Sequence, residues 1–255
     1  MIQKSYAKVN IFLKIVGKRD NYHLLASRFA KVYNLFDLIS FEKEKCENFT
    51  LQGNFSCALE KNSIYKAYLA LSKYENVKEF FKNHKVVVDK KIPEFAGLGG
   101  GSSNAATFLN MVNEACSLNL SIDELAKIGF SIGADVPFFV YDYSSANVSG
   151  VGEIVQEFKE DRLNIEVFTP NIKCDTAQIF KTFSANFYKE CSKEAANTLF
   201  QKSSKEILNS HTIDYANDLY KASKSLYPNL GDYEKDTWFF SGSGSSFFRI
   251  VDEKN

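Results

Sequence analysis

Alternation of apolar and polar residues predicts that the chain opens with a β-strand. Between Ser5 and Val16 every second residue is apolar, at positions 7, 9, 11, 13 and 15, which is the period of a strand with one buried face. Lys8 and Asn10 share the other face, two residues and roughly 7 Å apart. On pattern alone, we expect this second face to be solvated.

A turn and a second strand are predicted next. Residues 17–21 read Gly-Lys-Arg-Asp-Asn, a composition typical of turns, and Asn21 is a residue type that tolerates left-handed backbone. Tyr22 and His23 follow directly, where pattern alone predicts an aromatic ring at a strand edge and a surface imidazole. Residues 29–41 supply strand material, which we expect Asp37 to interrupt.

Helical periodicity dominates the middle of the chain. Asn62 is a suitable N-cap for a helix with apolar residues at positions 64, 67, 68 and 71. After a strand predicted over residues 85–89, a further helix carries apolar residues at positions 105, 108, 109, 112 and 116. Ser121 and Glu124 form a capping-box pattern for another helix, which we expect to end between Gly129 and Gly133.

Asp135 lies between two apolar segments. It follows that helix end and precedes Val136, Pro137 and the apolar run Phe138-Phe139-Val140, for which we expect a strand. A lone Asp at such a junction is usually a turn or cap residue. The alternative is a catalytic carboxylate held at the edge of the core.

The second half of the chain is expected to form a separate domain. We place the boundary near Phe158, so that the domains are residues 1–157 and 158–255. The second domain is predicted to contain a strand over residues 165–169, a helix capped by Asp175, and a polar helical region over residues 184–227. It closes with two strands that flank the small-residue loop 241–246.

A glycine-rich segment joins the strand at residues 85–89 to the helix after residue 104. It reads Pro93-Glu94-Phe95-Ala96-Gly97-Leu98-Gly99-Gly100-Gly101-Ser102-Ser103-Asn104. Glycine permits positive φ and close approach of another group, and the Ser and Asn residues are expected to cap the helix. Because a helix N-terminus attracts anions, the segment predicts a phosphate-binding loop.

The two commonest phosphate-binding motifs do not fit this segment. A Walker A motif needs a Lys beside Ser or Thr, and there is no Lys between Lys91 and Lys127. The dinucleotide motif needs a Gly where Ser102 stands. A flexible linker is the alternative, but a linker would not lead directly into a strongly periodic helix.

Composition narrows the classes of partner. Lys+Arg and Asp+Glu both number 31, so the zero net charge gives no reason to expect nucleic acid or a membrane. The absence of an apolar signal core or a membrane-length apolar run predicts a cytoplasmic location. The five cysteines and three histidines are scattered, so neither a disulfide framework nor a zinc site is expected.

The segment from Pro93 to Asn104 resembles the nucleotide loop of the GHMP small-molecule kinases. The form Gly-Leu-Gly-Gly-Gly-Ser-Ser-Asn is most similar to the branch of this family that phosphorylates 4-diphosphocytidyl-2-C-methyl-D-erythritol in the non-mevalonate isoprenoid route. Ala7-Lys8-Val9-Asn10, Tyr22-His23, Gly133-Ala134-Asp135-Val136-Pro137 and the 241–248 loop resemble other motifs of that branch, in the same order. The branch usually has a glycine where Asn21 stands.

The resemblance implies an α+β, two-domain GHMP kinase fold, with a ribosomal-protein-S5-like N-terminal domain and a ferredoxin-like C-terminal domain. It implies ATP as co-substrate, Mg²⁺, a small cytidyl substrate and a monomer or weak homodimer. Lys8 and Asp135 would be catalytic, with Asp135 ionised beside the Lys. The residues that would bind ATP are Asn62, Lys90, Pro93, Glu94, Phe95, Ala96, Gly97, Leu98, Gly99, Gly100, Gly101, Ser102 and Ser103.

The resemblance also implies where the cytidyl substrate binds. Tyr22 and Phe180 would stack on opposite faces of the cytosine, with His23 at its edge and Asn10 facing the reacting group. Protein ligands of the metal are not readable from the sequence, although a loop serine such as Ser102 is a candidate. Two alternatives stay open: a GHMP kinase acting on homoserine or mevalonate, and a non-catalytic ligand-binding relative.

Overall fold

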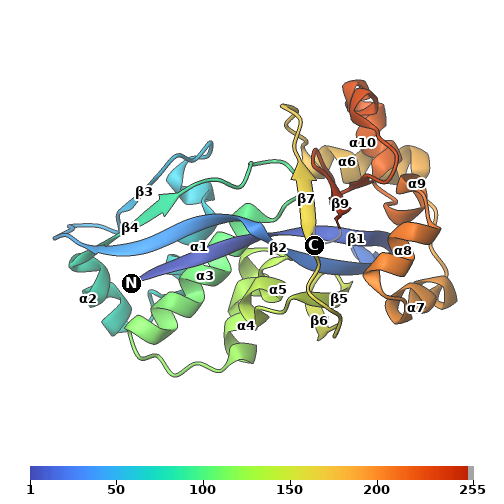
Figure 1. The fold of residues 1–255 in the computed structure, drawn as a ribbon. Helices are drawn as coiled ribbons and strands as arrows, with labels where there is room; N and C mark the ends of the chain where they lie inside the picture. Colours follow the sequence, from blue (N-terminus) through green and yellow to red (C-terminus); the bar gives the residue numbers. More distant parts are fainter. Residues whose placement is uncertain (252–255) are drawn as a thin grey trace. The chain divides into compact units, whose positions relative to one another are not determined.

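The computed structural model describes residues 1–251, which form a mixed α and β structure (Figure 1). The strands are β1 (Ile2–Arg19), β2 (Tyr22–Lys43), β3 (Leu51–Gly53), β4 (His84–Asp89), β5 (Ser145–Gly150), β6 (Ile154–Glu157), β7 (Ile165–Phe168), β8 (Phe239–Phe240) and β9 (Phe247–Ile250). No helix within residues 1–251 is both long enough and apolar enough to span a membrane.

The helices follow the strands in alternating blocks along the chain. The α-helices are α1 (Ser63–Leu71), α2 (Glu75–Lys82), α3 (Gly100–Ala115), α4 (Ile122–Ile132), α5 (Val136–Tyr141), α6 (Thr176–Thr182), α7 (Lys193–Gln201), α8 (Ser204–Ser210), α9 (Ile213–Ala216) and α10 (Tyr220–Leu226). A π-helical turn over Phe183–Phe187 continues α6, and short 3₁₀ turns lie at Leu59–Lys61 and Pro228–Tyr233.

The chain packs into two compact units, each built from separate segments. Unit 1 contains residues 1–7, 35–92 and 99–142, and the described part of unit 2 contains residues 8–34, 93–98 and 143–251. Residues 8–34 and 93–98 thus pack with the second half of the chain. The predicted boundary between residues 157 and 158 stays a prediction.

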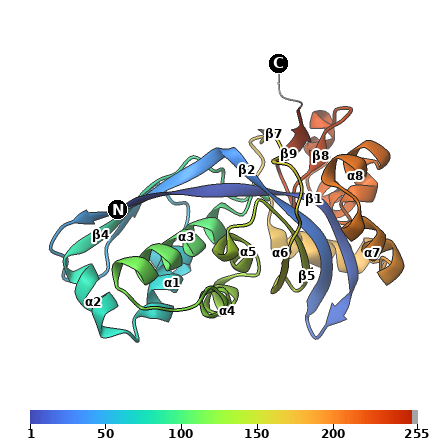
Figure 2. The same ribbon diagram turned by 60° about the horizontal axis from the view of Figure 1, so that its bottom comes forward.

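Unit 1 is a sheet with helices on one face. The end of β2 pairs antiparallel with β4, from Leu38 opposite Asp89 to Lys43 opposite His84, and β3 pairs parallel with β4. Figure 2 shows α1, α3 and α4 below β2. The predicted apolar face of α3 is confirmed, because it is buried at Ala105, Phe108, Leu109, Val112 and Cys116.

Unit 2 contains the first part of β2 with β5 and β6, a separate three-stranded sheet and most of the later helices. The first part of β2 pairs antiparallel with β5, from Leu25 opposite Gly150 to Ala30 opposite Ser145, and β5 pairs with β6. A separate sheet has the order β7-β9-β8 and is antiparallel. Ile15 of β1 and the buried residues Ile179, Phe183, Tyr220 and Phe240 share one apolar core.

The prediction of a strand after Pro137 is wrong, because residues Val136–Tyr141 form helix α5. All five residues from Val136 to Val140 are buried, so periodicity alone could not separate a short buried strand from a buried helix. Pro137 lies in the first turn of the helix, where its fixed φ and missing N–H are tolerated.

The predicted break at Asp37 is also wrong. The strand β2 runs through Asp37 without a break, because the buried carboxylate finds hydrogen-bond donors, including the N–H groups of Lys91 and Ile92. In the turn before β2, Asp20 takes left-handed backbone, at φ 54°. Asp tolerates this conformation for the same reason as Asn.

The polar face of β1 is buried rather than solvated. Lys8 and Asn10 are 3% and 2% exposed, which is unusual for these residue types unless their polar atoms are paired. The expectation drawn from alternation alone is therefore wrong for this strand, and the burial of Lys8 marks it as a residue with a specific environment.

Candidate active site

The helix after the glycine-rich segment begins without a side-chain cap. Gly99 is the N-cap residue, with φ 69° and ψ 19°, and no side chain accepts a hydrogen bond from the first turn of α3. Left-handed backbone at this point favours glycine. The first N–H groups of a helix lack intrahelical partners, so the start of α3 offers backbone donors and a positive dipole end to an anion.

The predicted capping by the two serines and Asn104 is wrong. Helix α3 starts earlier than expected, at Gly100, so Ser102, Ser103 and Asn104 lie inside it. The hydroxyl of Ser103 instead lies 2.8 Å from that of Ser5 on β1. Ser103 therefore fixes α3 to β1 instead of capping the helix.

The first part of the glycine-rich segment packs within unit 2. The N–H of Ser246 donates to the carbonyl of Ala96 at 3.1 Å, and the Ser241 hydroxyl donates to the carbonyl of Gly97 at 2.9 Å. A Cβ on Gly97, whose φ is 74°, would stand 2.0 Å from the carbonyl oxygen of Ser241. Only glycine fits there, because any side chain would separate the segment from the loop between β8 and β9.

Lys8 and Asn10 are brought together as the alternation of β1 predicts. The ammonium of Lys8 donates to Asn10 Oδ1 at 2.6 Å and to the carbonyl of Gly97 at 3.1 Å, and it lies 4.6 Å from the centre of the Phe29 ring. Asn10 in turn donates to the Ser27 hydroxyl at 3.0 Å. These contacts hold a buried cation beside the glycine-rich segment.

Asp135 lies at the N-cap position of α5, directly after the end of α4. Its neighbour Gly133 lies close to Ser102 of α3, because a Cβ on Gly133 would stand 3.7 Å from the Ser102 hydroxyl oxygen. Packing within unit 1 therefore places the Gly133–Asp135 turn beside the first turn of α3. A carboxylate and a hydroxyl from these two turns are the oxygen ligands that Mg²⁺ prefers.

Asn62 and Lys90 have defined structural partners. The Asn62 side chain caps α1 by accepting from the N–H of Ile64 at 2.9 Å, which confirms the predicted N-cap. The Lys90 ammonium donates to Asp37 at 2.5 Å and to Asn104 at 3.2 Å. Their predicted contacts with ATP stay predictions.

His23 and Phe180 meet although they lie far apart in the sequence. The two rings are stacked with centres 5.2 Å apart, and His23 Nε2 lies 2.8 Å from the Ser184 hydroxyl. Burial, and then the charge of Lys18, lower the pKa of His23 below its ordinary value, so its imidazole is neutral at pH 7. Tyr22, on the same turn, is 63% exposed.

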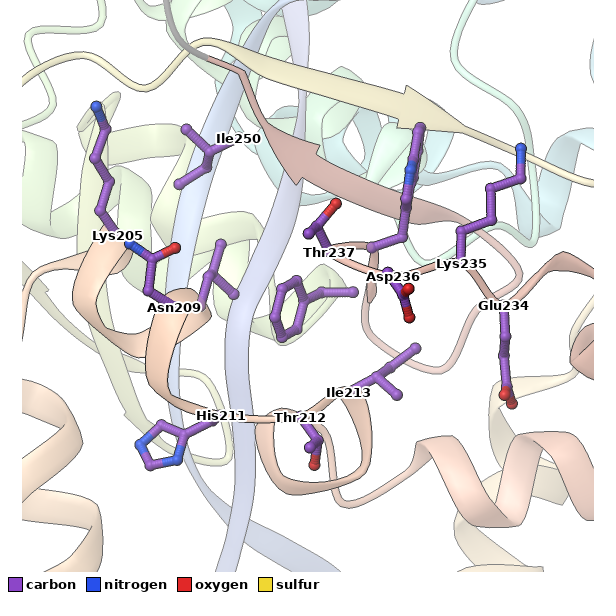
Figure 3. Close-up of a pocket in the computed structure, with 13 residues that line it drawn as sticks. Lys205, Asn209, His211, Thr212, Ile213, Glu234, Lys235, Asp236, Thr237 and Ile250 are labelled. Carbon is purple, nitrogen blue, oxygen red and sulfur yellow. The ribbon is translucent and has the colours of Figure 1, made fainter.

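A groove of about 1010 Å³ in unit 2 is built from a different set of residues. Figure 3 shows Lys205 and Asn209 of α8 on one side and Lys235, Asp236 and Thr237 on the other. None of the predicted site residues lines it. The groove is therefore not the site that the motifs indicate.

Sequence reasoning missed three residues with defined roles around these motifs. Ser184 contacts His23, Ser241 contacts Gly97, and Asp37 contacts the chain on both sides of the glycine-rich segment. Ser184 carries no pattern signal, because single serines are common along any chain. Ser241 does carry one, since it opens the 241–248 loop whose motif resembles the family. Asp37 also carries one: a lone acidic residue inside an apolar strand signals a buried, partnered carboxylate.

Comparisons with known proteins agree with these motifs. The model of the GHMP kinases N terminal domain matches residues 62–143. A 4-diphosphocytidyl-2-C-methyl-D-erythritol kinase from Sulfurimonas denitrificans is 49% identical over 261 residues, covering 100% of this chain and 98% of the relative. The chain belongs to the 4-diphosphocytidyl-2-C-methyl-D-erythritol kinase family. It is an enzyme, a small-molecule kinase of the GHMP type.

A further relative and two solved structures are also similar to this chain. A kinase of this family from Campylobacter jejuni is 41% identical, with 97% of this chain and 99% of the relative covered. A crystal structure of 4-(cytidine 5'-diphospho)-2C-methyl-D-erythritol kinase has a TM-score of 0.74 and 27% identity, covering 99% of this chain and 90% of that one. The mevalonate kinase of Methanococcus jannaschii, at 16% identity and a TM-score of 0.58, shares the fold.

Proposed function

We propose that this kinase transfers the γ-phosphoryl group of ATP to the 2-hydroxyl of 4-diphosphocytidyl-2-C-methyl-D-erythritol, in the non-mevalonate route to isoprenoid precursors. The observation that carries this proposal is the 49% identity, over the full chain, to an enzyme of that name. The contact between His23 and Phe180 supports it, because a flat cytosine ring needs aromatic faces and a hydrogen-bonding edge.

The start of α3 would bind the phosphates of ATP. Its uncapped N–H groups follow a left-handed glycine and point along the positive end of the helix dipole. Phosphoryl transfer depends mainly on positioning and on neutralisation of charge. Residues 93–103 would supply the positioning through backbone donors that are already in place before ATP arrives.

Lys8 and Asp135 would act on the reacting groups. The buried Lys8 ammonium would stabilise negative charge that develops on the transferring phosphoryl group. Asp135 would accept the proton of the substrate hydroxyl, as base or as an orienting acceptor. Asn10 would hold the Lys8 ammonium in place through the 2.6 Å hydrogen bond.

Mg²⁺ would be held mostly by the phosphates of ATP. This ion typically takes one or two protein oxygens and keeps the rest of its shell for phosphate and water. Ser102 and Asp135 fit that requirement, because their turns are neighbours within unit 1. When bound, the ion neutralises charge on the β- and γ-phosphates.

The cytosine would bind beside His23 and Phe180, with Tyr22 covering its free face. The neutral state of His23 suits hydrogen bonding to an uncharged base edge. We infer a cytoplasmic enzyme that works as a monomer or weak homodimer, with no nucleic-acid partner, in keeping with the zero net charge.

A direct test is transfer of labelled γ-phosphate from ATP to three alcohols in parallel. 4-Diphosphocytidyl-2-C-methyl-D-erythritol should be phosphorylated, and homoserine and mevalonate should not. Phosphorus NMR of the product should show a new phosphomonoester beside an intact diphosphate. Efficient transfer to homoserine or mevalonate, with none to the cytidyl alcohol, would refute the proposed substrate.

A further inference from the structure

Asp37 is a buried carboxylate that the proposed function leaves without a role. It lies within β2, in the part of that strand that belongs to unit 1, and its exposure is 0%. A buried carboxylate is stable only when several donors compensate for lost water. The identity of those donors is what connects Asp37 to the glycine-rich segment.

One carboxylate oxygen holds the chain just before that segment. Asp37 Oδ1 accepts from the backbone N–H of Lys91 at 2.6 Å and from that of Ile92 at 2.8 Å. Ile92 directly precedes Pro93, where the predicted ATP-binding segment begins. The carboxylate thereby fixes the direction in which the chain leaves β4.

The other oxygen holds the chain just after the segment. Asp37 Oδ2 accepts from the Lys90 ammonium at 2.5 Å and from Asn104 Nδ2 at 2.8 Å. Asn104 lies in α3, directly after Ser103, the last predicted ATP-binding residue. A single side chain therefore connects the two flanks of residues 93–103.

The network continues through neighbouring polar groups. Asn104 Nδ2 also donates to the Ser5 hydroxyl at 2.9 Å, and Ser5 is bonded to Ser103. Ser5, Ser103 and Asn104 are all buried. Buried networks are stiff when every member is satisfied, and they lose that order when one member is changed.

We propose that Asp37 is a positioning residue for ATP, which sets the geometry of the glycine-rich segment by holding both of its flanks. This inference rests on the proposed role of that segment in binding ATP. Backbone donors bind phosphate tightly only if they are already oriented, because ordering them on binding costs affinity. Loss of the carboxylate should therefore weaken ATP binding without touching the cytidyl site.

The test is Asp37→Asn, which replaces an acceptor oxygen by an amide facing the Lys90 and Asn104 donors. The Kd for ADP, measured by calorimetry, and the KM for ATP should both rise at least about tenfold. The kcat at saturating ATP and the KM for the cytidyl alcohol should stay close to wild type. If Asp37 had only a structural role, the substitution would lower the melting temperature and leave the Kd for ADP and the KM for ATP unchanged.

Asp89→Asn is the matched control. Asp89 ends β4 and pairs with Lys91 at 3.1 Å, but its side chain is 54% exposed. The substitution removes a carboxylate charge from the residue directly before Lys90, and it should leave the affinity for ADP unchanged.

Charge relocation gives an independent readout. In Asp37→Asn combined with Asn104→Asp, the carboxylate moves to the partner position, where it can still pair with Lys90 and accept from the new amide. This pair should recover most of the lost ADP affinity. If Asp37→Asn does not fold, Asn104→Ala removes one arm of the network, and it should weaken ADP binding in the same direction.

Wild-type ADP affinity in Asp37→Asn or in Asn104→Ala would overturn the inference. The inference would also fail if the double variant Asp37→Asn with Asn104→Asp bound ADP no more tightly than Asp37→Asn alone. The variant Gly99→Ala distinguishes failure of the proposed role of Asp37 from failure of the proposed ATP site. If Gly99→Ala binds ADP weakly and Asp37→Asn binds it normally, only the positioning role of Asp37 is rejected. If both variants bind ADP normally, the role of the glycine-rich segment in binding ATP is rejected as well.

Discussion

The imidazole of His23 stacks on the ring of Phe180, with ring centres 5.2 Å apart and planes inclined by 29°. We predict that His23→Ala and Phe180→Ala each raise the KM for the cytidyl substrate at least about tenfold, or about 1.4 kcal/mol, through lost stacking or hydrogen bonding. The KM for ATP should hardly change. Steady-state kinetics with each substrate varied in turn would measure both constants.

Unit 1 offers a matched control for that experiment. His84 stacks on Phe80 with ring centres 4.0 Å apart, and neither residue is a predicted site residue. His84→Ala should leave both KM values unchanged. If His23→Ala and Phe180→Ala weaken ATP binding and spare the cytidyl substrate, the assignment of the two sites is reversed.

The lowered pKa of His23 predicts a pH dependence of stability. Burial and Lys18 lower the pKa of His23 below the ordinary 6.5, so the unfolded chain binds its proton more readily than the folded protein does. The free energy of unfolding should therefore fall as the pH drops below about 6.5. The urea concentration at the midpoint of unfolding should change less between pH 7.5 and pH 5.5 in His23→Gln than in wild type. An equal change in the two proteins would contradict the lowered pKa of His23.

Asp135 and Lys8 are predicted to act in the chemical step. Asp135→Asn should lower kcat at least about a hundredfold, the usual scale for losing a positioned base, while the fold and the ADP affinity survive. Lys8→Ala should lower kcat similarly through lost charge stabilisation, and Lys8→Met should do the same while keeping an apolar stem against Phe29. Single-turnover rates at saturating substrates measure this step.

Asp142→Asn is the control for the charge change at Asp135. Asp142 ends α5 in left-handed backbone, at φ 59°, a conformation that Asn adopts as readily. This variant should retain wild-type kcat. Full activity in Asp135→Asn would remove Asp135 from the mechanism.

Gly99 is predicted to be essential to the phosphate-binding segment. Gly99→Ala places a side chain at φ 69°, which costs about 1–2 kcal/mol and shifts the first N–H groups of α3. Calorimetry should show a sharp loss of ADP affinity. Gly150→Ala puts a side chain at φ 70° at the last residue of β5, where the new Cβ would stand 2.4 Å from Glu153 Oε2. Although this strain is at least as large, the variant should leave ADP affinity intact.

The sequence by itself determined the family and most of the elements around residues 93–104, and it supplied the prediction that these residues bind phosphate. Local chemistry is sufficient for these features. Asn62 and Asp175 cap helices in the structure as predicted, and Ser121 and Glu124 form the predicted capping box, because a cap involves residues within one turn of each other. The alternation of β1 likewise placed Lys8 and Asn10 on one face.

Only the tertiary structure decided which residues meet across long stretches of sequence. Asp37 was expected to break a strand, and it instead holds Lys91 and Asn104, because the donors that stabilise its carboxylate come from other elements. The run from Val136 to Val140 became a helix because burial on all sides removes the periodic signal. Ser184 came to contact His23 through the packing of unit 2, since a serine carries no local pattern that names its partner.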